Sequence, residues 1–335
     1  MIQEHFSLKP YNTFGIDAKA TFFCEIDSIE RLQYILTHDQ LVHLPKLILG
    51  EGSNILFTQD FPGIVCRMKI KGIEQVEEDS EHIWIKAGAG ENWHNFVLYC
   101  LANQYAGVEN LSLIPGTVGA APMQNIGAYG VELTQVFEKL TALRIEDGAI
   151  QSFTHQDCQF GYRESVFKNI FKNKFIITDV TLRLNKKPQF HLEYGALKQM
   201  LNPNQELTIK KISDAVIEIR TQKLPNPKII GNAGSFFKNP VVGSQKLEEI
   251  KSVYPDVPHH LTADNHYKLA AAWLIEQCHW KGYREKNIGV HKHHALVLVN
   301  YGGGSGKAIF QLAKNIQHSV MEKFGVELLA EVNII

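Results

Sequence analysis

The residues of this chain best suited to chemistry lie in glycine-rich and polar loops. The first such loop follows an apolar run and consists of Gly50, Glu51, Gly52, Ser53 and Asn54. Its two glycines permit positive φ angles, so consecutive backbone N–H groups can form an anion-binding nest. This pattern predicts a pyrophosphate site, although an ordinary tight hairpin between two strands would give the same pattern.

A second glycine-rich segment covers residues 107–130 and contains five glycines and two prolines, with neither helical nor strand periodicity. A long irregular loop inside a compact domain is usually functional. The Pro115-Gly116 pair suits a type II turn, and the glycines let backbone approach a ligand closely. Together the two loops indicate one bound dinucleotide. The QNIGAYG stretch at the end of the segment suits hydrogen bonding to a flavin edge or to a substrate, but it could equally be a buried structural loop.

Two further polar positions stand out from their surroundings. Arg163 lies in FGYRES, where no apolar pattern explains it, and could clamp a carboxylate with two hydrogen bonds. Ser235 lies between small residues and an aromatic pair, and no G-x-S-x-G motif surrounds it, so hydrolase chemistry is unsupported. The alternatives are a solvated surface arginine and a serine that caps a helix.

Three familiar motifs are incomplete. Gly88-Ala89-Gly90 has Trp93 where a Rossmann fingerprint needs its third glycine, and YGGGSGKA lacks the Walker spacing. The histidines in VHKHHAL lie on or beside an expected strand without a nearby cysteine or carboxylate. We therefore expect neither a classical nucleotide fold nor a metal site.

Composition narrows the class of protein. A chain of 335 residues exceeds one hydrophobic core, so two or three domains are expected. The 34 basic residues nearly balance the 35 acidic ones, which points to no nucleic-acid surface. Five scattered cysteines, a polar N-terminus and the lack of an apolar run of about 20 residues indicate a cytosolic protein with reduced thiols.

The first two thirds of the chain predict a mixture of strands and helices. Strands are expected around residues 46–49, 55–57, 63–68 and 83–88. A helix is expected from Trp93 to Leu101, with Gly107 as its stop. The Asp147-Gly148 pair predicts a hairpin, and FIITDVTLRL alternates like a half-buried strand. A helical stripe from Ile209 to Ile219 ends near KLPNPK, where we place a domain boundary.

The C-terminal third reads as a separate α+β unit. Helices are expected at 244–254, 267–277 and 307–324, and a strand at 295–299. The tail VELLAEVNII is β-rich, so it could pair with a distant sheet.

Eight segments carry a resemblance to a known enzyme family. In chain order they are NTFGI, GEGSN, IPGTVGAAPMQNIGAYG, FGYRES, KLPNPK, GNAGSFFKNP, KLAAAWLIEQ and the terminal EV. They resemble the UDP-N-acetylenolpyruvoylglucosamine reductases, which act in bacterial peptidoglycan precursor synthesis, and the similarity runs from about residue 10 to the end. HLEYGALK resembles the branch of the family with an additional tyrosine-bearing loop.

The resemblance implies an α+β fold. An FAD-binding domain of the vanillyl-alcohol-oxidase (PCMH) type, built from two subdomains, would precede a C-terminal α+β substrate-binding domain. The first subdomain would cover residues 1–69 and be joined by the C-terminal strand 327–335. The second would cover 70–222, and the substrate-binding domain 223–326. The returning strand would bring Glu331 to the active site.

The resemblance also implies a reaction. NADPH would reduce a non-covalent FAD, and the enolpyruvyl ether of UDP-N-acetylglucosamine would then be reduced to UDP-N-acetylmuramate. Hydride addition at the methylene carbon leaves charge next to the carboxylate, so the protein must stabilise an enolate and deliver a proton. The implied partner is this small molecule, in the cytoplasm, without nucleic acid, membrane insertion or an obligate protein partner.

Positions that match the family motifs take on implied roles. Ser235 would be the proton donor, while Arg163 and Glu331 would orient the carboxylate and stabilise the enolate. The implied substrate contacts are Tyr129, between flavin and substrate, Tyr194 and Lys223 at the diphosphate, and Asn239 in support. The implied FAD contacts are Gly50, Glu51, Gly52, Ser53, Asn54, Pro115, Gly116, Thr117, Gly119, Ala120, Gln124, Asn125, Gly127 and Ala128.

Two positions depart from the family pattern, and two other functions compete. Asn333 stands where members often carry a basic residue after EV, and His294 stands where some carry an amide. An oxidase of the same flavoprotein superfamily would pass electrons to oxygen instead. A non-catalytic nucleotide-sugar binder would use Ser235, Arg163 and Glu331 only for structure.

Overall fold

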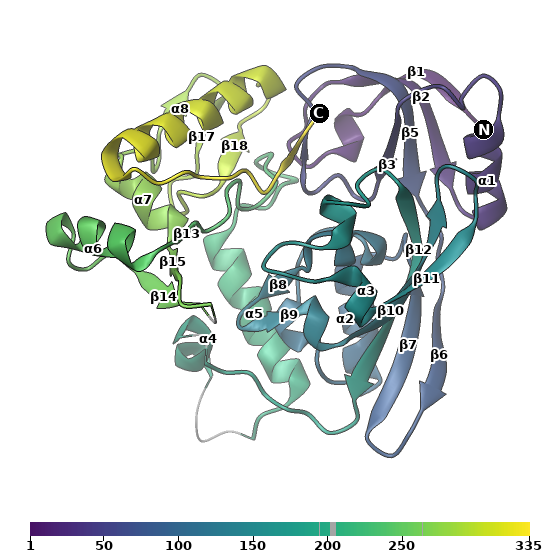
Figure 1. Ribbon diagram of the computed structural model, residues 1–335, viewed down its shortest axis with the longest axis horizontal. Coiled ribbons are helices and arrows are strands. Elements are labelled where there is room, and N and C mark those ends of the chain that lie inside the picture. Colours follow the sequence, from purple (N-terminus) through teal and green to yellow (C-terminus); the bar gives the residue numbers. More distant parts are fainter. Residues whose placement is uncertain (194, 202–205, 263) are drawn as a thin grey trace. The chain divides into compact units, whose positions relative to one another are not determined.

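The computed structural model describes residues 1–193, 195–201, 206–262 and 264–335, and its contacts divide the chain into two compact units (Figure 1). The first unit consists of Met1–Phe6, Ala20–Glu51 and Pro62–Gln222. The second consists of Ser7–Lys19, Gly52–Phe61 and Lys223–Ile335. The division into two FAD-binding subdomains and a substrate-binding domain stays a prediction.

A four-stranded sheet opens the first unit, in the order β1-β2-β5-β3. Its strands are β1 (Gln3–Ser7), β2 (Lys19–Ile26), β3 (Lys46–Leu49) and β5 (Phe61–Met68), and helix α1 (Ile29–Thr37) follows β2. Residues 50–54 join β3 to β4 (Ile55–Leu56), and these two strands do not pair with each other, because β3 pairs with β5 and β4 pairs with β19 (Asn333–Ile334). The hairpin alternative for residues 50–54 is therefore wrong.

A five-stranded antiparallel sheet forms the larger part of the first unit, in the order β11-β10-β12-β7-β6 (Figure 1). The strands are β6 (Ile73–Glu78), β7 (His82–Gly88), β10 (Phe137–Arg144), β11 (Ile150–Thr154) and β12 (Phe175–Asn185). The hairpin predicted at Asp147-Gly148 joins β10 to β11. The central strand β12 is mostly buried, so the expectation of a half-buried strand is wrong.

Helix α2 (Trp93–Ala102) confirms the predicted helix, and its buried apolar residues are Trp93, Phe96, Val97, Cys100 and Leu101. Asn92 caps its start by accepting a hydrogen bond from the Asn95 N–H at 2.9 Å. The helix ends before Asn103, so Gly107 is not its stop. Its apolar face belongs to the main hydrophobic core of the first unit, together with residues of β5, β7, β10 and β12.

The glycine-rich segment 107–130 and the residues directly after it form short turns and strands rather than an irregular coil. The short elements are η2 (Glu109–Leu111), η3 (Val118–Ala120), η4 (Pro122–Gln124), β8 (Gly127–Ala128), β9 (Val131–Glu132) and η5 (Leu133–Gln135). Tyr129 and Gly130 join β8 to β9 with φ angles of 50° and 85°. Two positive φ angles in a two-residue loop are typical of a type I′ hairpin.

The first unit also contains α3 (His155–Cys158), η6 (Val166–Lys168), α4 (Gly195–Met200) and α5 (Ile209–Lys223). The predicted stripe of α5 is buried: Ile209 belongs to the main core, and Ile212, Val216 and Ile219 form a second apolar cluster with Leu197 of α4. Tyr129 packs against this cluster.

The described residues of the second unit form small sheets and several helices. β4 (Ile55–Leu56) pairs in parallel with β19 (Asn333–Ile334), which confirms that the C-terminal tail pairs with a distant strand. The other strands are β13 (Val241–Val242), β14 (His259–Leu261), β15 (Tyr267–Leu269), β16 (Arg284–Glu285), β17 (Ile288–Val290) and β18 (Leu298–Asn300). A single turn, η1 (Lys9–Tyr11), lies near its N-terminal part.

The helices of the second unit are α6 (Ser244–Val253), α7 (Ala271–Gln277) and α8 (Gly306–Phe324). α8 packs against α7, β17 and β18. The helix expected at 267–277 begins only at Ala271, because 267–269 pair as β15 with β13 and β14. Within the described residues, no helix has the length and apolar character to cross a membrane.

Candidate active site

The two predicted cofactor loops meet within the first unit. The Glu51 carboxylate accepts hydrogen bonds from Asn92 Nδ2 at 2.6 Å and from the Gly116 N–H at 3.2 Å. A Cβ placed on Gly50 would lie 2.7 Å from Thr117 Oγ1, so only glycine fits there without a shift of Thr117. The loops around residues 50 and 116 therefore form one packed junction.

The turn at Gly88-Ala89-Gly90 belongs to the same junction. A Cβ on Gly90 would lie 2.6 Å from Lys69 Cα, and one on Gly119 would lie 2.9 Å from Ala89 Cα. The Gly119 N–H also donates to the Ala89 carbonyl oxygen at 2.9 Å. Sequence reasoning missed this turn because it tested the glycines only against the Rossmann spacing. Glycine is therefore needed at Gly90 and Gly119 for the close packing of protein backbone at this junction.

The other half of the first loop lies in the second unit. Gly52 has a φ of 64°, and a Cβ there would overlap the Tyr11 carbonyl oxygen. In the described part of the chain, the N–H groups of Gly52 and Ser53 donate no hydrogen bond, so they remain available to phosphate oxygens. Asn54 Nδ2 donates to the Glu331 carbonyl oxygen at 3.2 Å, which ties this loop to the C-terminal tail.

Two of the predicted catalytic residues lie on neighbouring segments of the second unit. Ser235 opposes Val297 in a β-bridge. The next residue, Phe236, accepts a hydrogen bond at its carbonyl oxygen from the Glu331 N–H at 2.8 Å. Backbone pairing thus brings the serine loop and the C-terminal segment together, although almost a hundred residues separate them along the chain.

The remaining predicted residues of the second unit are more dispersed. Asn239 accepts a hydrogen bond at Oδ1 from the Ala271 N–H at 3.0 Å, at the start of α7. Lys223 is exposed. His294 is partly buried and accepts a hydrogen bond at Nδ1 from the Leu296 N–H at 3.3 Å. Burial lowers the pKa of His294, and the nearby charges of His291 and Lys223 lower it further.

Asn333, the second departure from the family pattern, fixes the tail. Its backbone N–H and its Nδ2 both donate to the Asn54 carbonyl oxygen, at 3.1 Å and 3.0 Å. The residue therefore joins the tail to the nest of the first loop.

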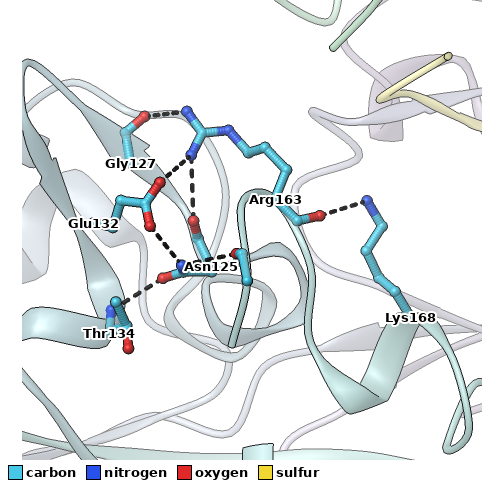
Figure 2. A network of polar contacts seen from close by, with 7 residues as sticks. Asn125, Gly127, Glu132, Thr134, Arg163 and Lys168 are labelled. Carbon is cyan, nitrogen blue, oxygen red and sulfur yellow. Dashed lines mark hydrogen bonds and ion pairs between the residues drawn. The ribbon is translucent and has the colours of Figure 1, made fainter. Parts of the chain in front are cut away.

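Figure 2 shows that the guanidinium of Arg163 contacts the β8–β9 hairpin of the first unit. Its guanidinium donates to the Gly127 carbonyl oxygen at 2.5 Å and to the Asn125 carbonyl oxygen at 3.3 Å. It also lies 3.8 Å from Glu132 Oε1. Asn125 Nδ2 donates a hydrogen bond to the other Glu132 oxygen, Oε2, at 2.9 Å, so Asn125 and Glu132 belong to the same network. Arg163 has a φ of 56°, a conformation that L-residues seldom adopt and that is frequent at functional sites.

Sequence reasoning missed a second arginine in this region. Arg220 of α5 has a buried Nε atom with no hydrogen-bond partner among the described residues. Burial lowers the pKa of its guanidinium; a hydrogen bond from Arg220 to Tyr129 opposes this effect, and the charge of Arg163 adds to it. A cation so placed, beside a second cation, favours an anionic ligand. Its position at the end of an otherwise regular helical stripe gave no sequence signal.

Some predictions remain without structural detail. Tyr194 lies outside the described residues. Pro115 and Ala120 are exposed, Asn125 is buried, and Gln124 is intermediate. Among the described side chains, no cluster of three or more His, Cys, Asp or Glu residues could hold a metal ion.

Comparison with known proteins defines the class of this chain. Residues 20–154 match the model of an FAD binding domain, and residues 225–335 match the model of the UDP-N-acetylenolpyruvoylglucosamine reductase C-terminal domain. The chain is thus a flavin-dependent oxidoreductase. The α+β class, with an FAD-binding domain and a distinct C-terminal domain, is confirmed.

Full-length relatives identify the family. The chain is 55% identical over 336 residues to a UDP-N-acetylenolpyruvoylglucosamine reductase of Amoebophilus asiaticus, with 100% of this chain and 99% of the relative covered. It is 49% identical to that of Pseudomonas putida, covering 99% and 98%. The chain belongs to the UDP-N-acetylenolpyruvoylglucosamine reductase family. The crystal structure of the Thermus caldophilus reductase shares the fold, with a TM-score of 0.69, 23% identity and coverage of 100% and 98%.

Proposed function

We propose that this chain reduces UDP-N-acetylglucosamine enolpyruvate to UDP-N-acetylmuramate, with FAD as the bound cofactor and NADPH as its reductant. When bound, FAD supplies the hydride. The observation that carries the proposal is the pairing of the Ser235 loop with the C-terminal segment of Glu331. The paired segments carry a hydroxyl and a carboxylate, and hydride reduction of the enol ether needs a proton donor for the adjacent carbon.

In the second unit, Ser235 donates the proton. The hydride adds to the terminal methylene carbon of the substrate and forms a C–H bond there. The electron pair of the double bond moves onto the adjacent carbon and its carboxylate. Ser235 Oγ gives its proton to that carbon and recovers one from solvent. Glu331 orients the reacting group. Lys223 binds the diphosphate, and Asn239 supports the same site.

The residues of the first unit hold the anion and the cofactor. Arg163 stabilises the carboxylate and the enolate with its planar guanidinium, and the neighbouring charge of Arg220 supports it. The glycine loops of residues 50–54 and 115–128 hold FAD without a covalent bond. Tyr129 lies between flavin and substrate in this proposal, and Tyr194 contacts the diphosphate.

The cellular setting follows from the chemistry of the chain. Its five cysteines are free thiols. Free thiols persist in a reducing compartment, so we place the reaction in the cytoplasm.

The proposal is tested by following the flavin spectrum without oxygen. Purified protein is reduced with NADPH, and the enolpyruvyl substrate is then added. Prompt return of the oxidised spectrum supports the proposal. Reoxidation only after oxygen enters would favour the oxidase, and protein that binds substrate without any flavin turnover would favour the non-catalytic binder.

A further inference from the structure

A buried asparagine, Asn110, connects two separate segments of the first unit. Its side chain lies in the η2 turn and is 1% exposed. Nδ2 donates to the carbonyl oxygen of Tyr129 at 2.9 Å and to that of His191 at 2.9 Å. Both hydrogens of the side-chain amide therefore donate hydrogen bonds to backbone carbonyl oxygens, which lie 19 and 81 residues away along the chain.

The turn that carries Asn110 is itself firmly anchored. Trp93 Nε1 of α2 donates to the Leu111 carbonyl oxygen at 2.9 Å. Ser112 Oγ lies 2.7 Å from Ser213 Oγ of α5. The buried Glu109 carboxylate accepts from the Gly107 N–H at 2.7 Å, and burial raises the pKa of Glu109. Asn110 thus reaches Tyr129 from a platform held by two helices.

Tyr129 needs such support. It occupies the first position of the two-residue hairpin with a φ of 50°, where asparagine, aspartate or glycine is the usual choice. For an L-residue other than these, this left-handed conformation is unfavourable. Arg163 holds the start of the hairpin through the Gly127 carbonyl oxygen, while Asn110 holds the strained residue itself. A strained residue fixed by dedicated contacts is a frequent feature of functional sites.

We propose that Asn110 is a positioning residue for the substrate reaction, which fixes the backbone of Tyr129 so that its ring is presented in one orientation. The inference rests on the proposed function, because that function gives Tyr129 its place between flavin and substrate. Asn110 itself acts only through Tyr129 and the segment at His191. Loss of its two hydrogen bonds should therefore affect the substrate half-reaction more than FAD binding.

The test replaces Asn110 by aspartate, which has the same size but presents a carboxylate to two carbonyl oxygens. A second variant, Asn110→Ser, removes both bonds without adding charge and serves where the aspartate variant fails to fold. Ser213→Ala is the matched control, because it removes a buried hydrogen bond of the same platform without touching either carbonyl. FAD affinity, flavin reduction by NADPH, and KM and kcat for the enolpyruvyl substrate are measured for each protein.

We expect the Asn110 variants to bind FAD and react with NADPH within about twofold of the wild type, while KM for the substrate rises about tenfold. The control should lose thermal stability and keep its KM. An unchanged KM in Asn110→Ser would overturn the proposal, and so would an equal rise of KM in Ser213→Ala. A failure of the proposed function would appear differently, as a lack of turnover in the wild-type protein.

Discussion

The junction of the two cofactor loops allows a quantitative prediction at Gly50. A Cβ at this position would lie 2.7 Å from Thr117 Oγ1, 3.3 Å from Thr117 Cγ2 and 3.6 Å from Thr117 Cβ. Gly50 does not have a positive φ, so alanine is not strained by the backbone itself. The cost of Gly50→Ala should therefore arise from one side chain, that of the buried Thr117.

Overpacking of this kind typically costs about 1–3 kcal/mol. If that cost falls on the FAD-bound state, the Kd for FAD rises by a factor of about 5 to 150. Thr117→Ala removes the atoms at 2.7 Å and 3.3 Å and leaves only the ordinary contact at 3.6 Å. In that background Gly50→Ala should change the Kd by no more than about twofold, and the double-mutant cycle should give a coupling energy of about 1–3 kcal/mol.

The assay is titration of the apoprotein with FAD, followed by flavin fluorescence, for the wild type, both single variants and the double variant. Gly243→Ala serves as the matched control, because no atom lies within 4 Å of a Cβ there. An equal loss of affinity in both Thr117 backgrounds would show that the loops do not meet as described. A wild-type Kd together with a wild-type Tm in Gly50→Ala would refute the reasoning.

Three other substitutions test separate parts of the site. Ser235→Ala should leave flavin reduction by NADPH near normal and slow substrate reduction about 10²- to 10⁴-fold, measured by stopped flow; equal losses in both steps would reject a proton donor. Arg163→Lys loses the planar guanidinium, so kcat/KM should fall about 10- to 150-fold, and a loss below threefold would count against its role. His94 Nδ1 accepts from the Leu113 N–H at 3.0 Å, and burial, with the nearby Arg220, lowers the pKa of His94. The unfolded chain takes up a proton on His94 at a higher pH than the folded chain, so the stability of the fold should decrease as the pH drops below 6.5. His94→Asn keeps a hydrogen-bond acceptor and should show a flatter profile of Tm against pH. Identical profiles for the two proteins would exclude this linkage.

Periodicity predicted most of the regular elements, because apolar spacing reflects which face is buried. The helices predicted at 93–101 and 307–324 are present as α2 and α8, and the stripe predicted for α5 is buried. The errors have physical causes. Residues 267–269 alternate too briefly to be told from a helix, and only their pairing with β13 and β14 makes them a strand. β12 is buried on both faces, since neighbouring residues such as Ile176 and Ile177 both belong to the core, and no local pattern records which elements cover them.

The motifs predict Ser235, Arg163 and Glu331 as site residues, and these roles stay predictions. No local rule indicates that the Glu331 N–H pairs with the Phe236 carbonyl oxygen. Likewise, Arg220 Nε has no hydrogen-bond partner among the residues that the structure describes, and this depends on which side chains surround the end of α5. Such contacts join distant parts of the chain, so they follow from the fold and not from spacing.

The two sets of site residues differ in how the fold holds them, and this difference affects how mutants should be interpreted. In the first unit, Arg163 uses its side chain to hold the β8–β9 hairpin, so its replacement changes both charge and structure. In the second unit, backbone pairing fixes the Ser235 loop against Leu296 and the C-terminal tail. Ser235→Ala keeps every one of these backbone bonds. A loss of rate in that variant therefore reports chemistry, whereas a loss in an Arg163 variant must be separated from movement of the hairpin.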